Sequence, residues 1–230
     1  MYRTFLKVCG LKHRQDVDKL KGLDLDAVGL ILVPGRKRSV SREEAKELVS
    51  RLPQKLDIVG VMMDPEPEEV MAWMSLIPLD RIQLHGEESP SLCRRIKVET
   101  GIPLVKAIHL DEKGEGNQEP GEYAPWVDVV LLDSVLKGVR GGTGVSFPWM
   151  KISDYQQRWS PYGIPVWVAG GIHPDNVEKL LRTHQPAGID VSSGTETEGR
   201  KDREKMNQLV KRVRIYDKRK SNSGTSRTLR

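Results

Sequence analysis

Two side chains that can move protons stand at the ends of apolar runs far apart in the chain. Cys9 ends the first run, in Val8-Cys9-Gly10, and Asp133 ends the sixth, in Leu131-Leu132-Asp133. A thiol and a carboxylate placed in this way can face each other only if their strands open onto one mouth. A parallel barrel has such a mouth, since its catalytic groups lie where the strands end. The pair therefore favours acid–base chemistry at one end of a barrel.

Eight short apolar runs supply the strands for such a barrel. They are nearly continuous rather than alternating, which is typical of strands buried on both faces of a parallel sheet. The predicted strands cover residues 4–9, 27–32, 58–62, 81–84, 103–108, 127–132, 165–169 and 188–191. With helical stretches between them, eight alternating units predict an α/β fold, a single (β/α)8 TIM barrel, rather than an open doubly wound sheet.

The helical stretches carry start signals at most of these connections. Ser41 and Glu44 form a capping box ahead of AKELVSRL, in which each side chain satisfies a free backbone donor. Ser89-Pro90 places proline at the first position of another helix, where its missing N–H costs nothing. Residues 111–126, DEKGEGNQEPGEYAPW, lack an apolar stripe. We therefore expect the fifth helix to be short or missing.

The positive charge of the chain is concentrated at its end. The formal charge is +5 over 230 residues, while residues 211–230 hold eight Lys or Arg and one Asp, a local charge of +7 that leaves −2 for residues 1–210. We expect residues 1–214 to form the catalytic barrel domain and residues 215–230 a basic, disordered tail, because such a segment buries little apolar surface. A tail that binds nucleic acid is the alternative, and a solvated extension is favoured over it.

Neither a membrane span nor a targeting leader is visible. No stretch approaches the roughly 18 consecutive apolar residues that a span requires, and residues 1–10 already resemble a strand. Two cysteines without metal-ligand spacing suit a reducing compartment. We expect a cytoplasmic protein with no membrane partner and no bound metal. Cys93 lies on the apolar side of a helical stretch and is expected to be buried and inert, whereas structural and functional roles for Cys9 both stay open.

Two glycine-bearing segments follow the seventh and eighth predicted strands. They are Gly170-Gly171-Ile172 and Ser192-Ser193-Gly194. Glycine lets a backbone approach a ligand closely, and in barrels this corner commonly binds a phosphate. The two segments together predict a phosphorylated small molecule as the partner. A GxGxxG motif is absent after the first strand, which argues against a dinucleotide.

Segments along most of the chain resemble the phosphoribosylanthranilate isomerase family, in the same order. They are KVCGLK (7–12), DAVGLILVPGRKRSVS (26–41), VGVMMDPEPEEV (59–70), IQLHGEESPSLC (82–93), LLDS (131–134), GGTGVSFPW (141–149), VAGGIHPDNV (168–177) and DVSSGTETEGRKD (190–202). The resemblance implies a barrel enzyme of tryptophan biosynthesis that needs no cofactor and is a monomer or homodimer. It would convert N-(5'-phosphoribosyl)anthranilate to 1-(2-carboxyphenylamino)-1-deoxyribulose 5-phosphate by an Amadori rearrangement.

The resemblance also implies roles for individual residues. Cys9 matches the family's general base and Asp133 its general acid. Arg38 matches the arginine that pairs with the anthranilate carboxylate, a task that suits a bidentate guanidinium. The other matching positions form the phosphate loops, a mobile loop after the sixth strand and two polar groups at the mouth: Gly170, Gly171, Ser193 and Gly194; Gly141, Gly142 and Gly144; and His85 and Asp190. For the last two, a structural role in holding loop backbone is the alternative.

The implied chemistry places demands on the site. A thiol with a pKa near ~8.5 is only partly ionised at neutral pH, so the site must favour the Cys9 thiolate. Asp133 must hold a proton, which burial or nearby negative charge would favour. Two other functions compete. The histidine-pathway isomerase performs the same rearrangement with an aspartate where this chain has Cys9, and a barrel that only binds phosphate would lack Cys9 or Asp133.

Overall fold

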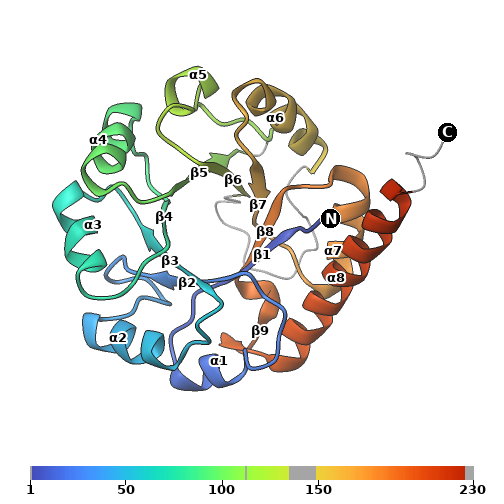
Figure 1. Ribbon diagram of the computed structural model, residues 1–230, viewed down its shortest axis with the longest axis horizontal. Coiled ribbons are helices and arrows are strands. Elements are labelled where there is room, and N and C mark those ends of the chain that lie inside the picture. The colour runs from blue at the N-terminus through green and yellow to red at the C-terminus, as the bar shows by residue number, and fades with distance from the viewer. Residues whose placement is uncertain (1, 112, 135–148, 226–230) are drawn as a thin grey trace.

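Eight parallel strands close into a barrel in the order β1 to β8, with helices on the outside (Figure 1). The computed structural model describes residues 2–111, 113–134 and 149–225. The strands are β1 (Phe5–Cys9), β2 (Ala27–Ile31), β3 (Asp57–Met62), β4 (Arg81–Leu84), β5 (Leu104–Leu110), β6 (Val129–Ser134), β7 (Val166–Val168) and β8 (Gly188–Val191). The predicted TIM barrel is confirmed, and every predicted strand overlaps an observed one.

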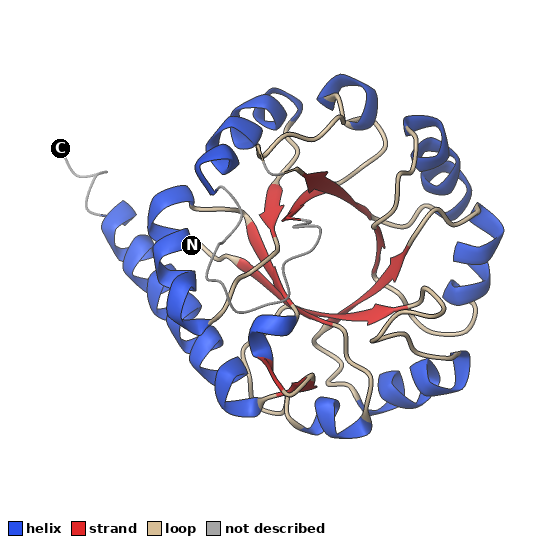
Figure 2. Cartoon of the chain, turned by 180° about the vertical axis from the view of Figure 1, so that it is seen from behind, coloured by secondary structure: helices blue, strands red, loops and turns tan. Residues whose placement is uncertain are grey.

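The helices occupy the predicted connections and ring the strands, as the view from behind shows (Figure 2). They are α1 (Arg14–Asp18), α2 (Arg42–Arg51), α3 (Pro67–Met74), α4 (Pro90–Thr100), α5 (Pro120–Tyr123), α6 (Ile152–Trp159), α7 (Pro174–His184) and α8 (Arg203–Thr225). Short 3-10 turns are η1 (Trp149–Lys151), η2 (Ser160–Tyr162) and η3 (Ser193–Thr195), and β9 (Glu196–Thr197) and β10 (Arg200–Lys201) form a hairpin after β8. No helix among the described residues is long and apolar enough to cross a membrane.

The helix starts follow the local chemistry. The Ser41 hydroxyl accepts a hydrogen bond from the Glu44 amide, and the Glu44 carboxylate accepts one from the Ser41 amide, so the predicted capping box opens α2. At the start of α4, ahead of Pro90, the Ser89 hydroxyl accepts a hydrogen bond from the Leu92 amide. The fifth helix is short, as predicted: α5 has four residues, because the segment before it offers no apolar stripe to pack against the barrel.

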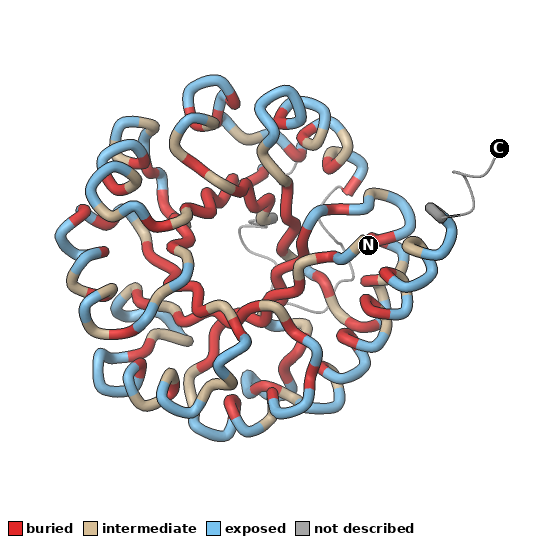
Figure 3. The backbone as a smooth tube through the Cα atoms, viewed as in Figure 1, coloured by how far each residue is buried: buried red, intermediate tan, exposed pale blue. Residues whose placement is uncertain are grey.

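The apolar core has two parts separated by the strands. A large outer cluster lies between strands and helices, so the buried part of the chain follows the strands and the inward sides of the helices (Figure 3). A small inner cluster lies inside the barrel and consists of Val105, Val129, Leu131, Trp167 and Ala169, with Phe5 packed against it. The rings of Phe5 and Trp167 stack with centroids 4.3 Å apart. This inner layer is the floor beneath the mouth.

The last helix extends beyond the predicted end of the barrel domain. Residues 215–225, which are predicted from composition to be part of a disordered tail, continue α8. The prediction is therefore wrong for these residues. Residues 226–230 lie outside the described part of the chain. Asp217 explains the difference. Its carboxylate is buried and accepts hydrogen bonds from the amide and hydroxyl of Thr4 at 3.1 and 2.7 Å.

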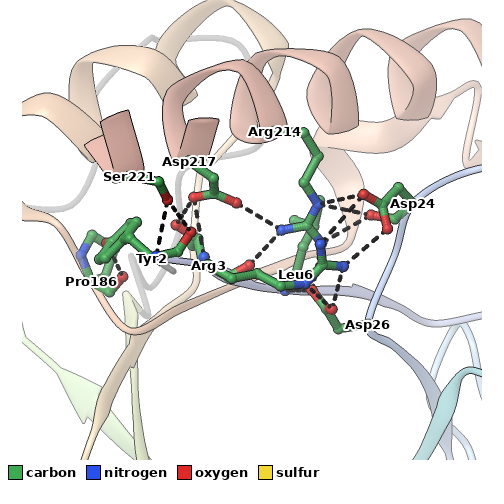
Figure 4. Close-up of polar contacts among 10 residues, drawn as sticks. Tyr2, Arg3, Leu6, Asp24, Asp26, Pro186, Arg214, Asp217 and Ser221 are labelled. Atoms are coloured by element: carbon green, nitrogen blue, oxygen red, sulfur yellow. Dashed lines mark hydrogen bonds and ion pairs between the residues drawn. The ribbon is translucent and has the colours of Figure 1, made fainter. Parts of the chain in front are cut away.

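Arg214 joins α8 to the amino ends of the first two strands (Figure 4). Its guanidinium donates to the Thr4 carbonyl at 2.7 Å and pairs with Asp26 at 2.5 Å and Asp217 at 3.0 Å. Asp26 in turn accepts a hydrogen bond from the Leu6 amide at 2.8 Å. The last helix is thereby held in place by hydrogen bonds with Thr4, just before β1, and by charge pairing with Asp26 in the loop before β2.

Candidate active site

The alternation of side chains along a strand brings the two predicted catalytic residues to the same place. Phe5 in β1 and Leu131 in β6 belong to the inner core, and successive side chains of a strand point to opposite faces. Cys9, four positions after Phe5, and Asp133, two after Leu131, therefore also face the barrel interior. Both lie at the carboxyl ends of their strands, because all eight strands run parallel. The predicted shared mouth is present.

Cys9 lies in a confined position between two neighbouring strands. It is 7% exposed and pairs in register with Gly29 of β2. A Cβ added at Gly29 would lie 2.6 Å from the Cys9 sulfur and 3.0 Å from the Lys7 ammonium, so this glycine makes room for both groups. Burial raises the pKa of the Cys9 thiol above its ordinary value, and the positive charge of Lys7 opposes that shift. The free protein thus favours the thiol rather than the expected thiolate.

A buried polar layer lies just below Cys9. The Lys7 ammonium donates to Asp190 at 2.7 Å and to the Gln83 amide oxygen at 2.9 Å, and all three residues are buried. Lys7 in β1 and Gln83 in β4 belong to strands that do not pair, so their contact crosses the barrel interior. Asp190, one of the predicted site residues, therefore lies in this layer. Its carboxylate pairs with the Lys7 ammonium and not with loop backbone. Burial lowers the pKa of Lys7, but the negative charge of Asp190 raises it, and the pKa of Lys7 lies above its ordinary value.

Lys7 and Gln83 escaped the sequence analysis, although a signal for them exists. Each stands two residues before a residue singled out there, Cys9 and His85, and therefore on the same strand face. Each is also a polar residue with an apolar residue on either side of it in the sequence. A search at every second position before Cys9 and His85 would have found both residues.

Asp133 has two histidines as neighbours. The Nε2 atom of His85 lies 3.3 Å from its carboxylate, and His109 of β5 pairs with Asp133 in register. The two imidazole rings meet edge to face with centroids 4.8 Å apart. His85 thus lies at the mouth as predicted, beside the candidate acid, and its own carbonyl accepts a hydrogen bond from His109 at 2.9 Å.

These three residues bring potential metal ligands within 4.8 Å of one another, but the hydrogen bonds do not suit a metal. Both ring nitrogens of His85 are engaged, Nδ1 with Gln83 at 3.1 Å and Nε2 with Asp133 at 3.3 Å. A ligating histidine needs one bare nitrogen that faces the ion. The cluster is therefore a polar group beside the Asp133 carboxylate, in which His85 lies at ion-pair distance from Asp133 and His109 bonds to the His85 carbonyl.

Arg38 also borders the mouth, where it has partners that the sequence did not predict. Its Nε and Nη2 atoms donate to the two carboxylate oxygens of Glu196 at 2.8 and 2.6 Å, and Lys201 donates to the same carboxylate at 2.8 Å. Although burial opposes it, this pairing holds the pKa of Glu196 below its ordinary value. Glu196 and Lys201 belong to the β9–β10 hairpin, and nothing in their spacing marks them as partners of Arg38.

A cavity of about 190 Å³ lies against this ion pair and is lined in part by Gly10, Arg38, Glu196 and Lys201. It opens beside the end of β1, so it adjoins the site. A larger cavity of about 420 Å³ lies away from the mouth, between the loop after β2 and the helices α2 and α3, and holds none of the predicted site residues. Of the two cavities, the smaller one is lined by a predicted site residue, Arg38.

The two predicted phosphate segments lie together. A Cβ at Gly194 would fall 1.8 Å from the Ile172 carbonyl oxygen, so the loops after β7 and β8 touch at a point where only glycine fits. Gly170 and Gly171 have φ angles of +80° and +63°, a conformation natural to glycine. Ser193 opens η3 beside them. The loop with Gly141, Gly142 and Gly144 lies outside the described residues.

Comparison with known proteins agrees with this architecture. Residues 6–212 match the family described as N-(5'phosphoribosyl)anthranilate (PRA) isomerase. A relative from Brevibacillus brevis named N-(5'-phosphoribosyl)anthranilate isomerase is 36% identical over 219 residues, which cover 95% of this chain and 97% of the relative.

Solved structures show the same likeness. A phosphoribosyl anthranilate isomerase crystallised with reduced 1-(o-carboxyphenylamino)-1-deoxyribulose 5-phosphate is 28% identical, with a TM-score of 0.75 and coverage of 92% of this chain and 99% of that one. The Thermotoga maritima enzyme, a dimeric isomerase solved as mutually generated monomers, is 29% identical with a TM-score of 0.74 and the same coverage.

Fold and matches together define an aldose–ketose isomerase built on a (β/α)8 barrel. Apart from Phe5 at the start of β1, the eight strands and the loops after β7 and β8 lie within the matched residues. The chain belongs to the N-(5'-phosphoribosyl)anthranilate isomerase family.

Proposed function

We propose that this protein converts N-(5'-phosphoribosyl)anthranilate to 1-(2-carboxyphenylamino)-1-deoxyribulose 5-phosphate in tryptophan biosynthesis, with Asp133 as general acid and Cys9 as general base. It would work in the cytoplasm, as a monomer or homodimer. The strongest support is the position of Cys9 and Asp133 on the interior face at one end of the barrel, in a chain of this family. The reaction reduces C1' of the sugar while it oxidises C2', so no external oxidant or reductant takes part.

Asp133 acts first. It donates its proton to the oxygen of the furanose ring, and the C1'–O bond breaks while the nitrogen lone pair forms a C1'=N⁺ Schiff base. The Cys9 thiolate then removes the proton from C2', whose C–H electrons form the C1'=C2' bond as the iminium electrons return to nitrogen. The resulting enolamine loses its C2' hydroxyl proton and gains one at C1', which gives the ketone.

The burial of Cys9 suits a base that is needed only after ring opening. In the free protein burial raises the pKa of the thiol, so the thiolate is scarce until a further positive charge arrives. The cationic Schiff base formed by Asp133 is such a charge, and it would lie beside the sulfur together with Lys7. An opposite charge within about 4–6 Å favours the ionised form. Ring opening would therefore help to ionise the base for the second step.

Arg38 can bind the anthranilate carboxylate while it keeps Glu196. A guanidinium has five N–H donors in a planar fork, and Glu196 takes only the edge formed by Nε and Nη2. The opposite edge, with Nη1 and the second Nη2 proton, stays available for a substrate carboxylate. The loops after β7 and β8, with Gly170, Gly171, Ser193 and Gly194, would hold the phosphate, so that both acidic groups of the substrate help to position the sugar.

A direct assay tests the proposal. Phosphoribosylanthranilate is generated in place, and the loss of its fluorescence is followed with the purified protein and its Cys9→Ala and Asp133→Asn variants. We expect turnover by the wild type and a fall of about 10²–10⁴ for each variant, the usual effect of a positioned acid or base. Cys93→Ala, which alters a buried thiol in α4, is the matched control and should keep its turnover.

Two results would contradict the proposal. A folded wild type that leaves the fluorescence unchanged would remove the activity altogether. Near-normal turnover in Cys9→Ala or Asp133→Asn would instead keep the activity and remove that residue from the mechanism. Because Asn is nearly isosteric with Asp, a product analogue should bind Asp133→Asn with affinity close to that of the wild type, which separates a chemical role from a binding role.

A further inference from the structure

Three polar side chains link the two candidate catalytic residues across the barrel. Lys7, whose ammonium lies against Cys9, donates to the Gln83 amide oxygen at 2.9 Å. The Gln83 amide nitrogen lies 3.1 Å from Nδ1 of His85, and Nε2 of His85 lies 3.3 Å from Asp133. Gln83 is 2% exposed and has both ends of its amide engaged, so water does not compete for the contacts of its amide.

Lys7 determines which way the Gln83 amide points. An ammonium group has three donors and no acceptor, so the atom that faces Lys7 must be the amide oxygen. The ammonium is itself held in place by Asp190 at 2.7 Å. The Gln83 NH2 group must therefore point the other way, toward His85.

The orientation of Gln83 in turn determines where the His85 proton lies. An amide NH2 group only donates hydrogen bonds, so Nδ1 of His85 must accept and carries no proton. In neutral His85 the proton is then on Nε2, which faces the Asp133 carboxylate. A second proton on Nδ1 would point at the NH2 group of Gln83, so this contact also opposes the imidazolium.

We propose that Gln83 is a positioning residue that keeps His85 in the neutral Nε2–H form, so that His85 presents an N–H group to Asp133 and cannot take its proton. This inference rests on the proposed function, in which Asp133 must hold a proton until the substrate arrives. With the opposite tautomer, a bare Nε2 would accept that proton, and the pair would become an imidazolium and a carboxylate. After proton transfer to the substrate, the Nε2–H group stabilises the carboxylate that remains.

The other groups around His85 are consistent with this assignment. His109 donates from Nε2 to the His85 carbonyl and not to its ring. Its ring meets that of His85 edge to face. Among the described hydrogen bonds and ion pairs, the ring nitrogens of His85 have Gln83 and Asp133 as their partners. The tautomer of His85 therefore depends on Gln83.

Nuclear magnetic resonance of the ring nitrogens tests the proposal without relying on activity. Long-range proton–nitrogen spectra distinguish the two neutral tautomers and the imidazolium, and His85→Asn identifies the His85 signals among the five histidines. In the wild type at pH 7 we expect the Nε2–H tautomer. In Gln83→Glu, a carboxylate keeps the contact with Lys7 but offers His85 an acceptor, so His85 should carry protons on both nitrogens.

Turnover of the Gln83 variants should change in parallel with the protonation state of His85. Gln83→Glu should lower kcat by about 10² with little change in KM, because it removes most of the general acid. Gln83→Met has a similar length but neither donates nor accepts, so it should give a mixture of tautomers and a smaller fall in kcat. Should Gln83→Glu fail to fold, the wild-type and Gln83→Met spectra still decide the question.

Three observations would overturn the proposal: an Nδ1–H tautomer in the wild type, an imidazolium in the wild type at pH 7, or unchanged His85 signals in both Gln83 variants. A wild type that shows the expected tautomer but does not isomerise phosphoribosylanthranilate would instead overturn the proposed function and leave the Gln83–His85 assignment in place. The two failures are thus distinguishable.

Discussion

Cys9 and Gly29 lie opposite each other on β1 and β2, and the sulfur occupies the space that a side chain at position 29 would need. A Cβ there would approach the sulfur to 2.6 Å and the Lys7 ammonium to 3.0 Å. The candidate base and the cation beside it therefore share a niche that exists because one residue of the neighbouring strand has no side chain.

Gly29→Ala should displace both groups and lower turnover by about 10², the effect of moving a reacting group by about 1 Å. The fold should persist, since β2 and its pairing partners are otherwise unchanged. Turnover in the fluorescence assay and thermal unfolding together check this. The control is Gly121→Ala, in the short helix α5, where the nearest atom to the new Cβ is the Tyr162 hydroxyl oxygen at 3.1 Å. Normal turnover in Gly29→Ala would show that the sulfur position is not critical.

Arg38→Ala should weaken binding of a product analogue by about 1.5–3 kcal/mol, as expected for hydrogen bonds to a charged group. Arg36→Ala is the matched control, because Arg36 lies in the same loop and is exposed. Titration calorimetry measures both. Equal losses for the two variants would indicate only a general effect of positive charge.

Glu196→Gln tests whether the hairpin positions Arg38. The variant keeps the shape but removes the charge that holds both Arg38 and Lys201. We expect KM to rise by about 10-fold with kcat nearly unchanged, since the loss of one charge-assisted hydrogen bond corresponds to about 1.5 kcal/mol. Glu198→Gln, at an exposed position of the same hairpin, is the control. An unchanged KM in Glu196→Gln would mean that Arg38 keeps its orientation without this partner.

Ionisation of Cys93 should lower the stability of the folded protein at alkaline pH. Burial raises the pKa of its thiol from 9.0 to about 12. Because the folded-state pKa is raised, the thiol contributes stability below the unfolded value, and this contribution is lost as the pH rises from about 9 to 12. Urea unfolding across that window should show a slope smaller by up to about 1.4 kcal/mol per pH unit in Cys93→Ala than in the wild type. Equal slopes would show that Cys93 ionises alike in both states.

Arg214 should matter far more for stability than its place near the chain end suggests. Arg214→Met leaves the carboxylates of Asp26 and Asp217 without their buried partner, and breaking a buried pair costs about 3–5 kcal/mol. Arg219→Met is the control, since Arg219 is exposed and forms a single longer ion pair, at 3.7 Å from Glu178. Urea unfolding measures both. Similar midpoints for the two variants would contradict a stabilising role for the Arg214 cluster.

The sequence was sufficient for the strands and for the positions of Cys9 and Asp133, because continuous apolar runs and their ends depend on local residue types. It was not sufficient for contacts that join distant segments. Glu196 meets Arg38 across 158 positions, and Asp217 meets Thr4 across 213. Composition alone made residues 215–225 resemble a solvated tail, since it cannot show that a buried carboxylate anchors them. Such pairs are decided by the closed barrel and not by local pattern.

The attachment of α8 to β1 has a consequence for synthesis of the protein. While the chain is still on the ribosome, β1 pairs with β2 on one side only, and its other edge stays open until β8 has emerged. The contacts of Arg214 and Asp217 with Thr4 come later still. An unpaired strand edge is a template for association with other chains. A nascent chain interrupted shortly before residue 214 would therefore leave the ribosome with its first strand poorly anchored, and would depend on chaperones to remain monomeric.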